Sequence, residues 1–195
     1  MMKSLVIFSA LAFVISTGVG LYVLDDSDEP VSPFSRMDFG GDFLLYNGND
    51  EVRLSDYHGK VVMIFFGYTS CPDICPATMA TLSAALKKLD DDEVAKVQVL
   101  FISVDPERDT VDSLNSYTEY FHPNILGITG SKQEIDQVVK QYGSAYRKVN
   151  SDSAIGYLVD HSSAVYVVDA KGELKDMLAV NKPVEDVADS IRKWL

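Results

Sequence analysis

The sequence predicts an α/β fold in which a mixed central β-sheet carries helices on both faces, joined to an N-terminal transmembrane helix. Three observations support this prediction. An apolar run from Leu5 to Leu24 contains no charged residue. Two continuously apolar segments, Val61–Gly67 and Val97–Val104, flank a segment with the spacing of an amphipathic helix. The chain ends with two more strand-like segments and a second amphipathic helix, so both parallel and antiparallel strands are expected.

The N-terminal apolar run has the length of a membrane span. About twenty residues with a rise of about 1.5 Å each match a hydrocarbon core of roughly 30 Å. Lys3 precedes the run and acidic residues follow it, which keeps the N-terminus in the cytoplasm and exports the rest. A signal peptide has a shorter core, of about 7–15 residues, and cleavage near Gly18 or Gly20 is the alternative. We therefore predict an uncleaved anchor, residues 1–24.

The anchor predicts the location of the protein. No Arg-rich amphipathic presequence is present, and no cysteine before Cys71 is available for acylation. We expect a single-pass protein of a bacterial inner membrane with its C-terminal domain in the periplasm. Residues 25–35 are acidic and contain Pro30 and Pro33, which is typical of a solvated linker. The domain proper is predicted at residues 36–195.

Composition narrows the classes of function. Hydrophobic residues make up 47% of the chain and charged residues 24%, so a packed core is expected. The formal net charge of −12 repels phosphates, and no run of Lys or Arg offsets it locally. Binding to nucleic acid is therefore not expected, whereas a metal ion or a cationic partner would suit this charge.

The first part of the domain combines a hairpin with alternating strands and helices. The hairpin is predicted at Asp42–Tyr46 and Glu51–Leu54, around the turn signal Asn47-Gly48. Val61–Gly67 is apolar on both faces, as expected of a central buried strand. The elements predicted next are a helix at Pro76–Leu89, a strand at Val97–Val104, a helix at Val111–Phe121, a strand at Ile125–Ile128 and a helix at Ser131–Tyr142.

The last part of the domain has a different pattern. Ala164–Val168 and Glu173–Ala179 form a second predicted hairpin around the turn Asp169–Gly172. Asn181–Leu195 is predicted to be a helix with Pro183 near its first turn. A βαβ unit followed by a ββα unit is the order of elements in a thioredoxin-like sandwich, which is the fold that we predict.

The two cysteines of the chain lie between the first central strand and the first long helix. A helix that began at Pro72 would contain Pro76, which lacks an N–H group and clashes with the preceding turn. Placing Pro76 at the first helical position removes that conflict and makes Cys75 the cap. Cys71 and Cys75 would then lie at the positive end of a helix, where the thiolate is favoured over the thiol.

The spacing of the pair leaves several functions open. The pair can bind a metal, act as a redox couple, form a static disulfide or remain as two buried thiols. Three residues separate Cys71 from Cys75, which makes room for an ion between the sulfurs and still permits a disulfide. A disulfide that closes so short a loop stabilises a fold only modestly, and the strand-to-helix position is typical of a functional site.

A third ligand must come from elsewhere, and the chain has three histidines. His58 is interpreted as a turn residue, and His122 as a contact at a helix C-terminus. His161 immediately precedes Ser162-Ser163 and the predicted strand Ala164–Val168, whose start should lie beside the cysteines. A capping or surface role for His161 is the alternative. Two thiolates with one imidazole suit Cu(I) and tolerate Cu(II), whereas zinc usually needs a fourth ligand.

Three motifs in order make the chain resemble the Sco/SenC family over residues 36–195. The first motif runs from Gly67 to Pro76, the second from Ser103 to Thr110, and the third is Asp160-His161-Ser162-Ser163. The resemblance implies a thioredoxin-like fold, copper held by Cys71, Cys75 and His161, and delivery of copper to the binuclear site of cytochrome c oxidase subunit II. A second periplasmic copper chaperone or a thioredoxin-like reductant is a further candidate partner.

The same resemblance suggests roles for residues beside the ligands. Asp73 could tune the field at the ion, and Asp160 could orient the imidazole of His161. The segment Asp105–Thr110 has no ligand chemistry of its own, and loop shaping with helix capping by Asp109 or Thr110 explains it. The methionines, among them Met63, Met79 and Met177, are interpreted as core residues.

Two hypotheses of different class follow. The first is a metallochaperone, which exchanges copper ligands with its partner and turns over no substrate. The second is an enzyme, a thiol-disulfide oxidoreductase that uses Cys71 and Cys75 as a redox couple and reduces the cysteines of the oxidase copper site. Thiol exchange does not require His161, so this residue discriminates between the two. A peroxidase of the peroxiredoxin kind is a more distant third hypothesis.

Overall fold

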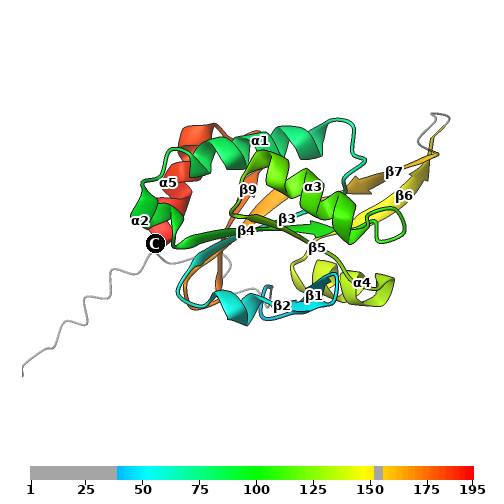
Figure 1. Cartoon of the computed structure of the whole chain (residues 1–195), viewed down its shortest axis with the longest axis horizontal. Coiled ribbons are helices and arrows are strands. Elements are labelled where there is room, and N and C mark those ends of the chain that lie inside the picture. Colours follow the sequence, from blue (N-terminus) through cyan, green and yellow to red (C-terminus); the bar gives the residue numbers. More distant parts are fainter. Residues whose placement is uncertain (1–38, 152–155) are drawn as a thin grey trace, which may run out of the picture. The chain divides into compact units, whose positions relative to one another are not determined.

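The computed structural model describes residues 39–151 and 156–195 (Figure 1). The predicted anchor, residues 1–24, and the predicted linker, residues 25–35, lie outside the described residues. Within the described part of the chain, no helix is both long enough and apolar enough to cross a membrane.

A five-stranded mixed sheet forms the centre of the domain. Its strands follow the order β5-β4-β3-β8-β9. β3 pairs in parallel with β4 and β4 with β5, whereas β8 is antiparallel to both β3 and β9. The strands are β3 (Val61–Gly67), β4 (Val97–Ser103), β5 (Ile125–Ile128), β8 (Ala164–Val168) and β9 (Leu174–Ala179). Every residue of β3 is buried, because both of its faces are covered, as its continuous apolar sequence predicted.

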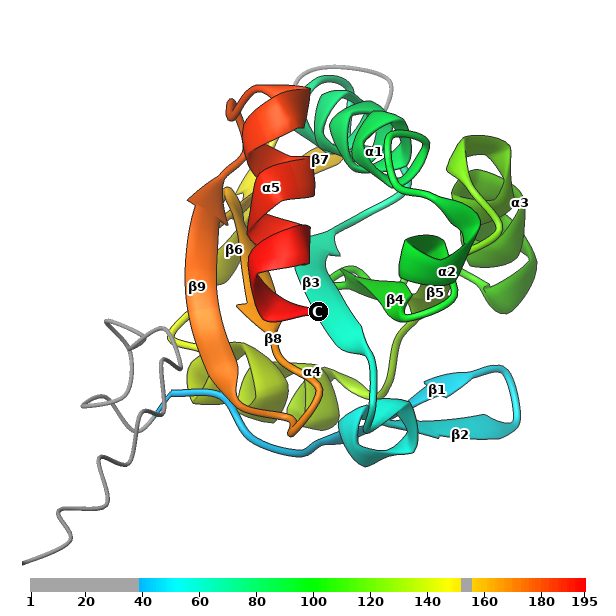
Figure 2. The same cartoon turned by 90° about the vertical axis from the view of Figure 1, so that its left-hand side faces the viewer.

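Helices cover both faces of this sheet, as expected (Figures 1 and 2). On one face lie α1 (Ile74–Leu86), α3 (Val111–Phe121) and α5 (Val184–Trp194). On the other face lie α4 (Lys132–Gln141) and the hairpin of β1 (Leu44–Asn47) and β2 (Asp50–Arg53), which leads into the 3-10 helix η1 (Leu54–Tyr57). The order of elements and the two covered faces confirm the predicted thioredoxin-like sandwich.

The first long helix begins earlier than we predicted. α1 starts at Ile74 with Asp73 as its N-cap, so Pro76 is the third helical residue and not the first. The prediction was wrong because the first four N–H groups of a helix have no intrahelical partner, so a proline costs no hydrogen bond at any of these positions. The first bond of the helix joins the N–H of Ala77 to the carbonyl of Asp73. Cys75 is therefore inside the first turn, and the helix ends at Leu86 rather than Leu89.

One hairpin and one short helix were not predicted, in addition to the 3-10 helix η1. β6 (Tyr146–Asn150) and β7 (Tyr157–His161) form an antiparallel hairpin, a two-stranded sheet in which Tyr146 faces His161. Most of its side chains are polar or partly exposed, so it lacks the apolar alternation by which strands are recognised. The sequence signal for the short helix α2 (Asp91–Val94) is a capping box between Asp90 and Glu93.

Candidate metal centre

The three side chains that were predicted as ligands come together. One ligand atom each from Cys71, Cys75 and His161 lies within 4.8 Å of the others. Cys71 lies on the loop after β3, Cys75 is the second residue of α1, and His161 is the last residue of β7. The Sγ of Cys75 is 3.4 Å from the Nε2 of His161, although 86 positions separate the two residues. In the described part of the chain this is the one cluster of three or more such side chains suited to a metal.

The end of β3 leaves room for the buried sulfur. A Cβ atom on Gly67 would lie 2.9 Å from the Sγ of Cys75 and 2.7 Å from the ring of Phe101. Both of these side chains are fully buried and could not move aside. Cys71 is only partly buried. The pair therefore has one cysteine that is fully buried against the sheet and one that is partly exposed.

Aromatic rings and one carbonyl orient His161. The imidazole lies edge-on to the rings of Phe65 and Tyr68, with centroids 6.0 Å away in each case. Its Nδ1 is 3.2 Å from the carbonyl oxygen of Ser162, which leaves Nε2 directed at the sulfurs. An Nδ1–H that donates to a carbonyl fixes the tautomer whose Nε2 can bind a metal.

Of the two acidic residues beside the ligands, the contacts of Asp160 differ from what the resemblance suggested, and the suggested role of Asp73 is not tested. The carboxylate of Asp160 pairs with the guanidinium of Arg147 at 2.9 Å, so the expected orienting role of Asp160 is wrong and the carbonyl of Ser162 takes it. The reason is that adjacent residues of a strand point to opposite faces. Asp73 is exposed and caps no N–H group with its side chain, and its effect on the field at an ion stays a prediction.

The two cysteines differ in acidity. A hydrogen bond from the Cys75 thiol lowers the pKa of Cys71 to about 3, with further help from His161 and from the N–H groups of Asp73 and Cys75. The same bond, together with burial, raises the pKa of Cys75 well above its usual range. The reduced pair therefore consists of an accessible thiolate and a buried thiol. This pattern suits both attack on a disulfide and binding of a soft cation.

The segment between β4 and α3 shapes the site without supplying a ligand, as expected. Asp109 is buried and accepts hydrogen bonds from Thr69 and Ser103. Thr110 is the N-cap of α3 and accepts from the N–H of Ser113. The capping role thus falls to Thr110, and the loop-shaping role to Asp109.

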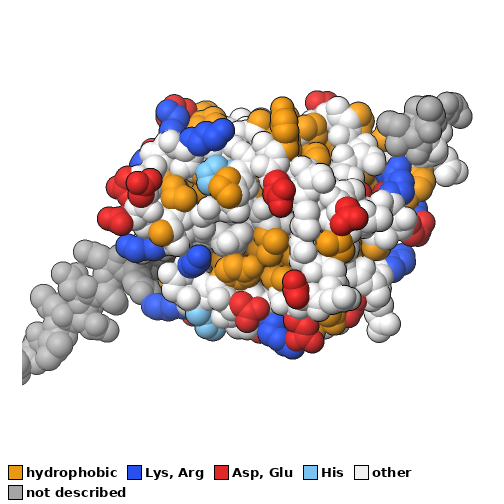
Figure 3. All heavy atoms as spheres, viewed as in Figure 1, with side chains coloured by type: hydrophobic (Ala, Val, Ile, Leu, Met, Phe, Trp, Pro, Cys, Tyr) orange, Lys and Arg blue, Asp and Glu red, His pale blue; other side chains and the backbone are white. Residues whose placement is uncertain are grey.

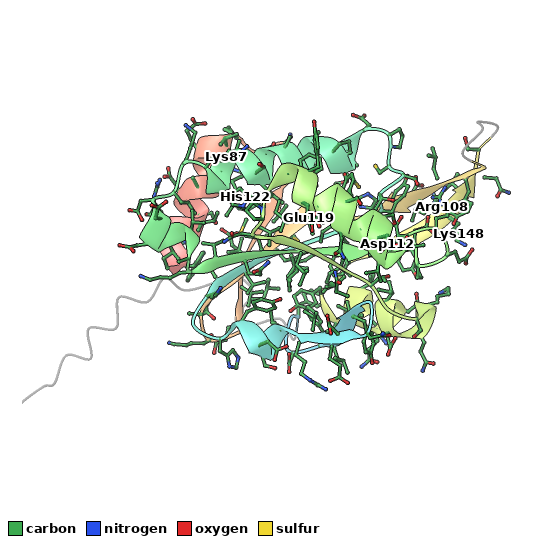
Figure 4. All side chains as sticks on the ribbon, in the orientation of Figure 1. Lys87, Arg108, Asp112, Glu119, His122 and Lys148 are labelled. Atoms are coloured by element: carbon green, nitrogen blue, oxygen red, sulfur yellow. The ribbon has the colours of Figure 1, made fainter. Side chains whose placement is uncertain are left out.

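The other two histidines are not part of the cluster. His58 is exposed at the end of η1. His122 is the C-cap of α3, accepts the N–H of Asn124 on Nδ1 at 3.1 Å, and lies with Lys87 at the far end of that helix from Asp112 (Figure 4). Both residues lie where they were predicted, in a turn and at a helix C-terminus. Of the methionines interpreted as core, Met63 and Met79 are fully buried, whereas Met177 is 45% exposed on β9, so its interpretation as core was wrong.

Sequence analysis missed the residues that frame the ligands. Phe65, Gly67 and Tyr68 were recognised only as a strand and a motif, although an apolar run that ends in Gly-Tyr three positions before the first cysteine was a usable signal. Tyr157 gave no signal, because the strand that carries it was not predicted.

The donor set fits copper. Metal bonds of about 2.0–2.3 Å to sulfur and nitrogen place the ligand atoms around one ion about 4 Å apart, and the three atoms here already lie within 4.8 Å. The two sulfurs are soft ligands that select Cu(I), and an imidazole also suits copper. The fold and the site together define a thioredoxin-like protein with an accessible thiolate, a buried thiol and an imidazole arranged as a soft-metal site.

This class has a named family, and the chain belongs to it: the model of the SCO1/SenC family matches residues 32–195. The SCO2 homolog of Bos taurus mitochondria is 39% identical over 157 residues, which cover 80% of this chain and 59% of that protein. The chain thus spans about three fifths of the length of this relative. The SCO2-like protein of Rickettsia felis is 36% identical over 94% of this chain and 95% of its own length. The copper-bound structure of Arabidopsis thaliana ScoI is 36% identical, with a TM-score of 0.73 over 80% of this chain and 97% of that one.

Proposed function

We propose that the chain binds copper through Cys71, Cys75 and His161 and delivers it to the binuclear copper site of cytochrome c oxidase subunit II. The observation that carries this proposal is the convergence of two sulfurs and one imidazole nitrogen within 4.8 Å. The copper bound in a relative that is 36% identical supports the choice of metal.

Ligand exchange is the mechanism that this arrangement favours. The thiolate of Cys71 is the reachable ligand, so a cysteine of the partner would meet the copper on that side. Cys75 is held inside the first turn of α1 and His161 at the end of β7, so these two ligands would keep the ion in place during the approach. The two sulfurs would hold Cu(I), and the imidazole would strengthen that binding and make Cu(II) acceptable as well.

We also propose the domain boundaries and location that the sequence indicates. Residues 1–24 would anchor the chain in a bacterial inner membrane, residues 25–35 would act as a linker, and residues 36–195 would bind copper in the periplasm. The Rickettsia felis relative, which aligns over almost its entire length, supports a bacterial protein of this size. The mammalian relative is named mitochondrial, so the family also occurs in that compartment.

Reduction of a partner's disulfide is the second candidate, and the unequal acidity of the cysteines favours it. The thiolate of Cys71 would attack one sulfur of the target disulfide, and the target's other sulfur would leave as a thiolate. Cys75 would then lose its proton and attack Cys71, releasing a reduced target and a Cys71–Cys75 disulfide. A thioredoxin-like reductant would have to return two electrons to the pair.

A copper titration tests the proposed function. The full-length protein is reduced without oxygen, loaded with Cu(I) and compared with Cys75→Ala and His161→Ala. His58→Ala is the matched control, because that histidine is exposed and lies outside the cluster. We expect about one copper per chain, weaker binding in the first two variants and unchanged binding in the control.

The outcome also separates the two candidates. A wild-type protein that retains no copper would refute copper delivery and leave thiol exchange. A His161→Ala variant that supports full oxidase assembly in cells would likewise favour the reductase, because thiol exchange needs only the two cysteines.

A further inference from the structure

The strand that carries His161 is not part of the central sheet. Within the described residues, β6 and β7 pair only with each other. A two-stranded hairpin is only marginally stable by itself, so other contacts must hold it in place. The position of His161 relative to the sulfurs depends on these contacts.

Side chains bind the outer edge of β7 where a neighbouring strand would otherwise lie. The hydroxyl of Tyr157 donates to the carboxylate of Asp105 at 2.7 Å. The guanidinium of Arg108 donates to the carbonyl of Tyr157 at 2.9 Å and stacks on its ring at 3.7 Å. The N–H of Val159 donates to the hydroxyl of Tyr68 at 3.3 Å. The carbonyl of Tyr157 and the N–H of Val159 have no neighbouring strand on this side, and side chains from the rest of the domain form hydrogen bonds with them instead.

Asp105 connects this edge to the central sheet. Its carboxylate is 0% exposed and is shared between Arg108 and Tyr157. Its backbone N–H donates to the hydroxyl of Ser103, the last residue of β4, at 3.1 Å. A buried carboxylate is costly without partners, so these bonds should hold a single geometry.

The same segment also contacts the loop that carries Cys71. Four positions further on, Asp109 accepts the N–H of Thr69 at 2.9 Å and its hydroxyl at 2.6 Å. Thr69 lies in the loop between β3 and Cys71. Asp109 also accepts the hydroxyl of Ser103 at 2.6 Å, and its own N–H donates to the carbonyl of Asp105. One short turn therefore contacts both the cysteine loop and the histidine strand.

We propose that residues 105–109 and Tyr157 form a bracket that sets the distance between His161 and the two sulfurs, with Tyr157 as a positioning residue for the metal ligand. Tyr157 and His161 lie on the same strand, about 13 Å apart along it at about 3.3 Å per residue. Because the strand is held at Tyr157, the position of His161 relative to the two sulfurs is held as well. This inference rests on the proposed function.

Two cations close to the Tyr157 ring strengthen the bracket. The guanidinium of Arg108 is 3.7 Å from the ring centroid and the Nζ of Lys148 is 4.6 Å from it. Lys148 also pairs with Glu107 of the same turn. Figure 4 shows Arg108 near Lys148, which belongs to the β6–β7 hairpin. The bracket thus contacts both strands of the hairpin, β7 through Tyr157 and β6 through Lys148.

The substitution Tyr157→Phe tests the bracket in the full-length protein. It removes one phenol-to-carboxylate bond and keeps the ring. Tyr146→Phe is the matched control, because the hydroxyl of Tyr146 donates to Asp136 at 2.6 Å, a bond of the same chemistry in the same hairpin but outside the bracket. We expect Cu(II) to bind about five- to tenfold more weakly in Tyr157→Phe, and nearly normally in Tyr146→Phe.

The readout must report on His161 itself. In electron paramagnetic resonance of the Cu(II) form, the nitrogen coupling from His161 should weaken or become heterogeneous in Tyr157→Phe, whereas the Cu(I) stoichiometry, which two sulfurs can support, should persist. In a His161→Ala background, Tyr157→Phe should have no further effect on copper affinity.

Two results would overturn the bracket. One is a Tyr157→Phe variant that matches Tyr146→Phe in affinity and nitrogen coupling. The other is an affinity loss of the same size with and without His161. If the wild-type protein itself binds no copper, the proposed function fails and not the bracket alone, so the two failures are distinguishable.

Discussion

At the scale of single residues, two cysteines four positions apart acquire opposite properties. The sulfur of Cys71 receives the hydrogen bond from Cys75 and faces N–H groups at the start of α1, so it is stable as a thiolate. The sulfur of Cys75 is packed against the sheet, where a charge would lack solvation, so it keeps its proton. Burial and hydrogen bonding, more than residue type, decide which cysteine reacts.

Alkylation across a range of pH tests this difference. Because the pKa of Cys71 is lowered to about 3, its thiolate fraction should stay constant between pH 5 and pH 8 in the reduced, copper-free protein. The rate of labelling by iodoacetamide should therefore be nearly independent of pH. An ordinary cysteine gains thiolate several hundred-fold, roughly, over that range.

The variant Cys75→Ala provides the control. It removes the hydrogen bond that contributes most to the low pKa, so labelling of Cys71 should regain a dependence on pH. A wild-type rate that climbs with pH as steeply as that of the urea-unfolded protein would contradict the low pKa.

At the scale of elements, the site depends on how closely α1 and β4 approach the end of β3. Gly67 is the last residue of β3, and the atoms that a methyl group would meet belong to Cys75 on α1 and Phe101 on β4. The closeness of these elements is what places a buried sulfur beside a β-strand. It requires a residue without a side chain at that position.

The substitution Gly67→Ala should disturb both the packing and the metal site. A contact of 2.7–2.9 Å with fully buried groups forces a shift, so we expect a loss of about 1–3 kcal/mol in the free energy of unfolding. Displacement of Cys75 should also weaken Cu(I) binding by at least about tenfold. Urea denaturation and a Cu(I) competition titration measure the two effects.

A second glycine of the same sheet separates the two effects. In Gly127→Ala the new methyl group meets Leu114 and Thr118 of α3 at 3.0 and 3.2 Å, away from the sulfurs. This variant should lose stability and keep its copper affinity. Equal losses of copper affinity in the two variants would show that general destabilisation, and not the position of Cys75, controls binding.

At the scale of the whole molecule, charge is the dominant feature. The chain carries a formal net charge of −12. Acidic and basic side chains are interspersed over the face in Figure 3, so the charges on this face are not gathered in one patch. Such a net charge keeps a protein soluble and repels like charges within the folded state.

Salt should therefore stabilise the domain. Raising the ionic strength from about 0.01 to 0.15 M shortens the Debye length from about 30 to 8 Å and screens repulsion between distant carboxylates. We expect the urea midpoint at pH 7 to rise, and the increase to shrink at pH 5, closer to the sequence pI of about 4.5. A midpoint that falls with salt would mean that surface ion pairs outweigh the repulsion.

Much of the fold was predictable because its signals are local. Val61–Gly67, Val111–Phe121 and Ile125–Ile128 were predicted with the observed bounds, since burial of one or both faces imposes a periodicity on neighbouring residues. β6 and β7 were missed because partly exposed strands need no apolar alternation. The start of α1 was misplaced because a proline is tolerated throughout the first helical turn.

By itself, the sequence determined the α/β class, the chemistry of the three predicted ligands and the motifs that carry the resemblance to the family. These properties reside in residue types and short spacings. Only the tertiary structure decided that Cys75 is buried and Cys71 accessible, that Ser162 and not Asp160 orients His161, and that Asp105 and Asp109 contact the histidine strand and the cysteine loop. These outcomes depend on contacts between distant positions, such as the 3.4 Å approach of His161 to Cys75, and only the packing of the sheet, the helix and the hairpin brings such positions together.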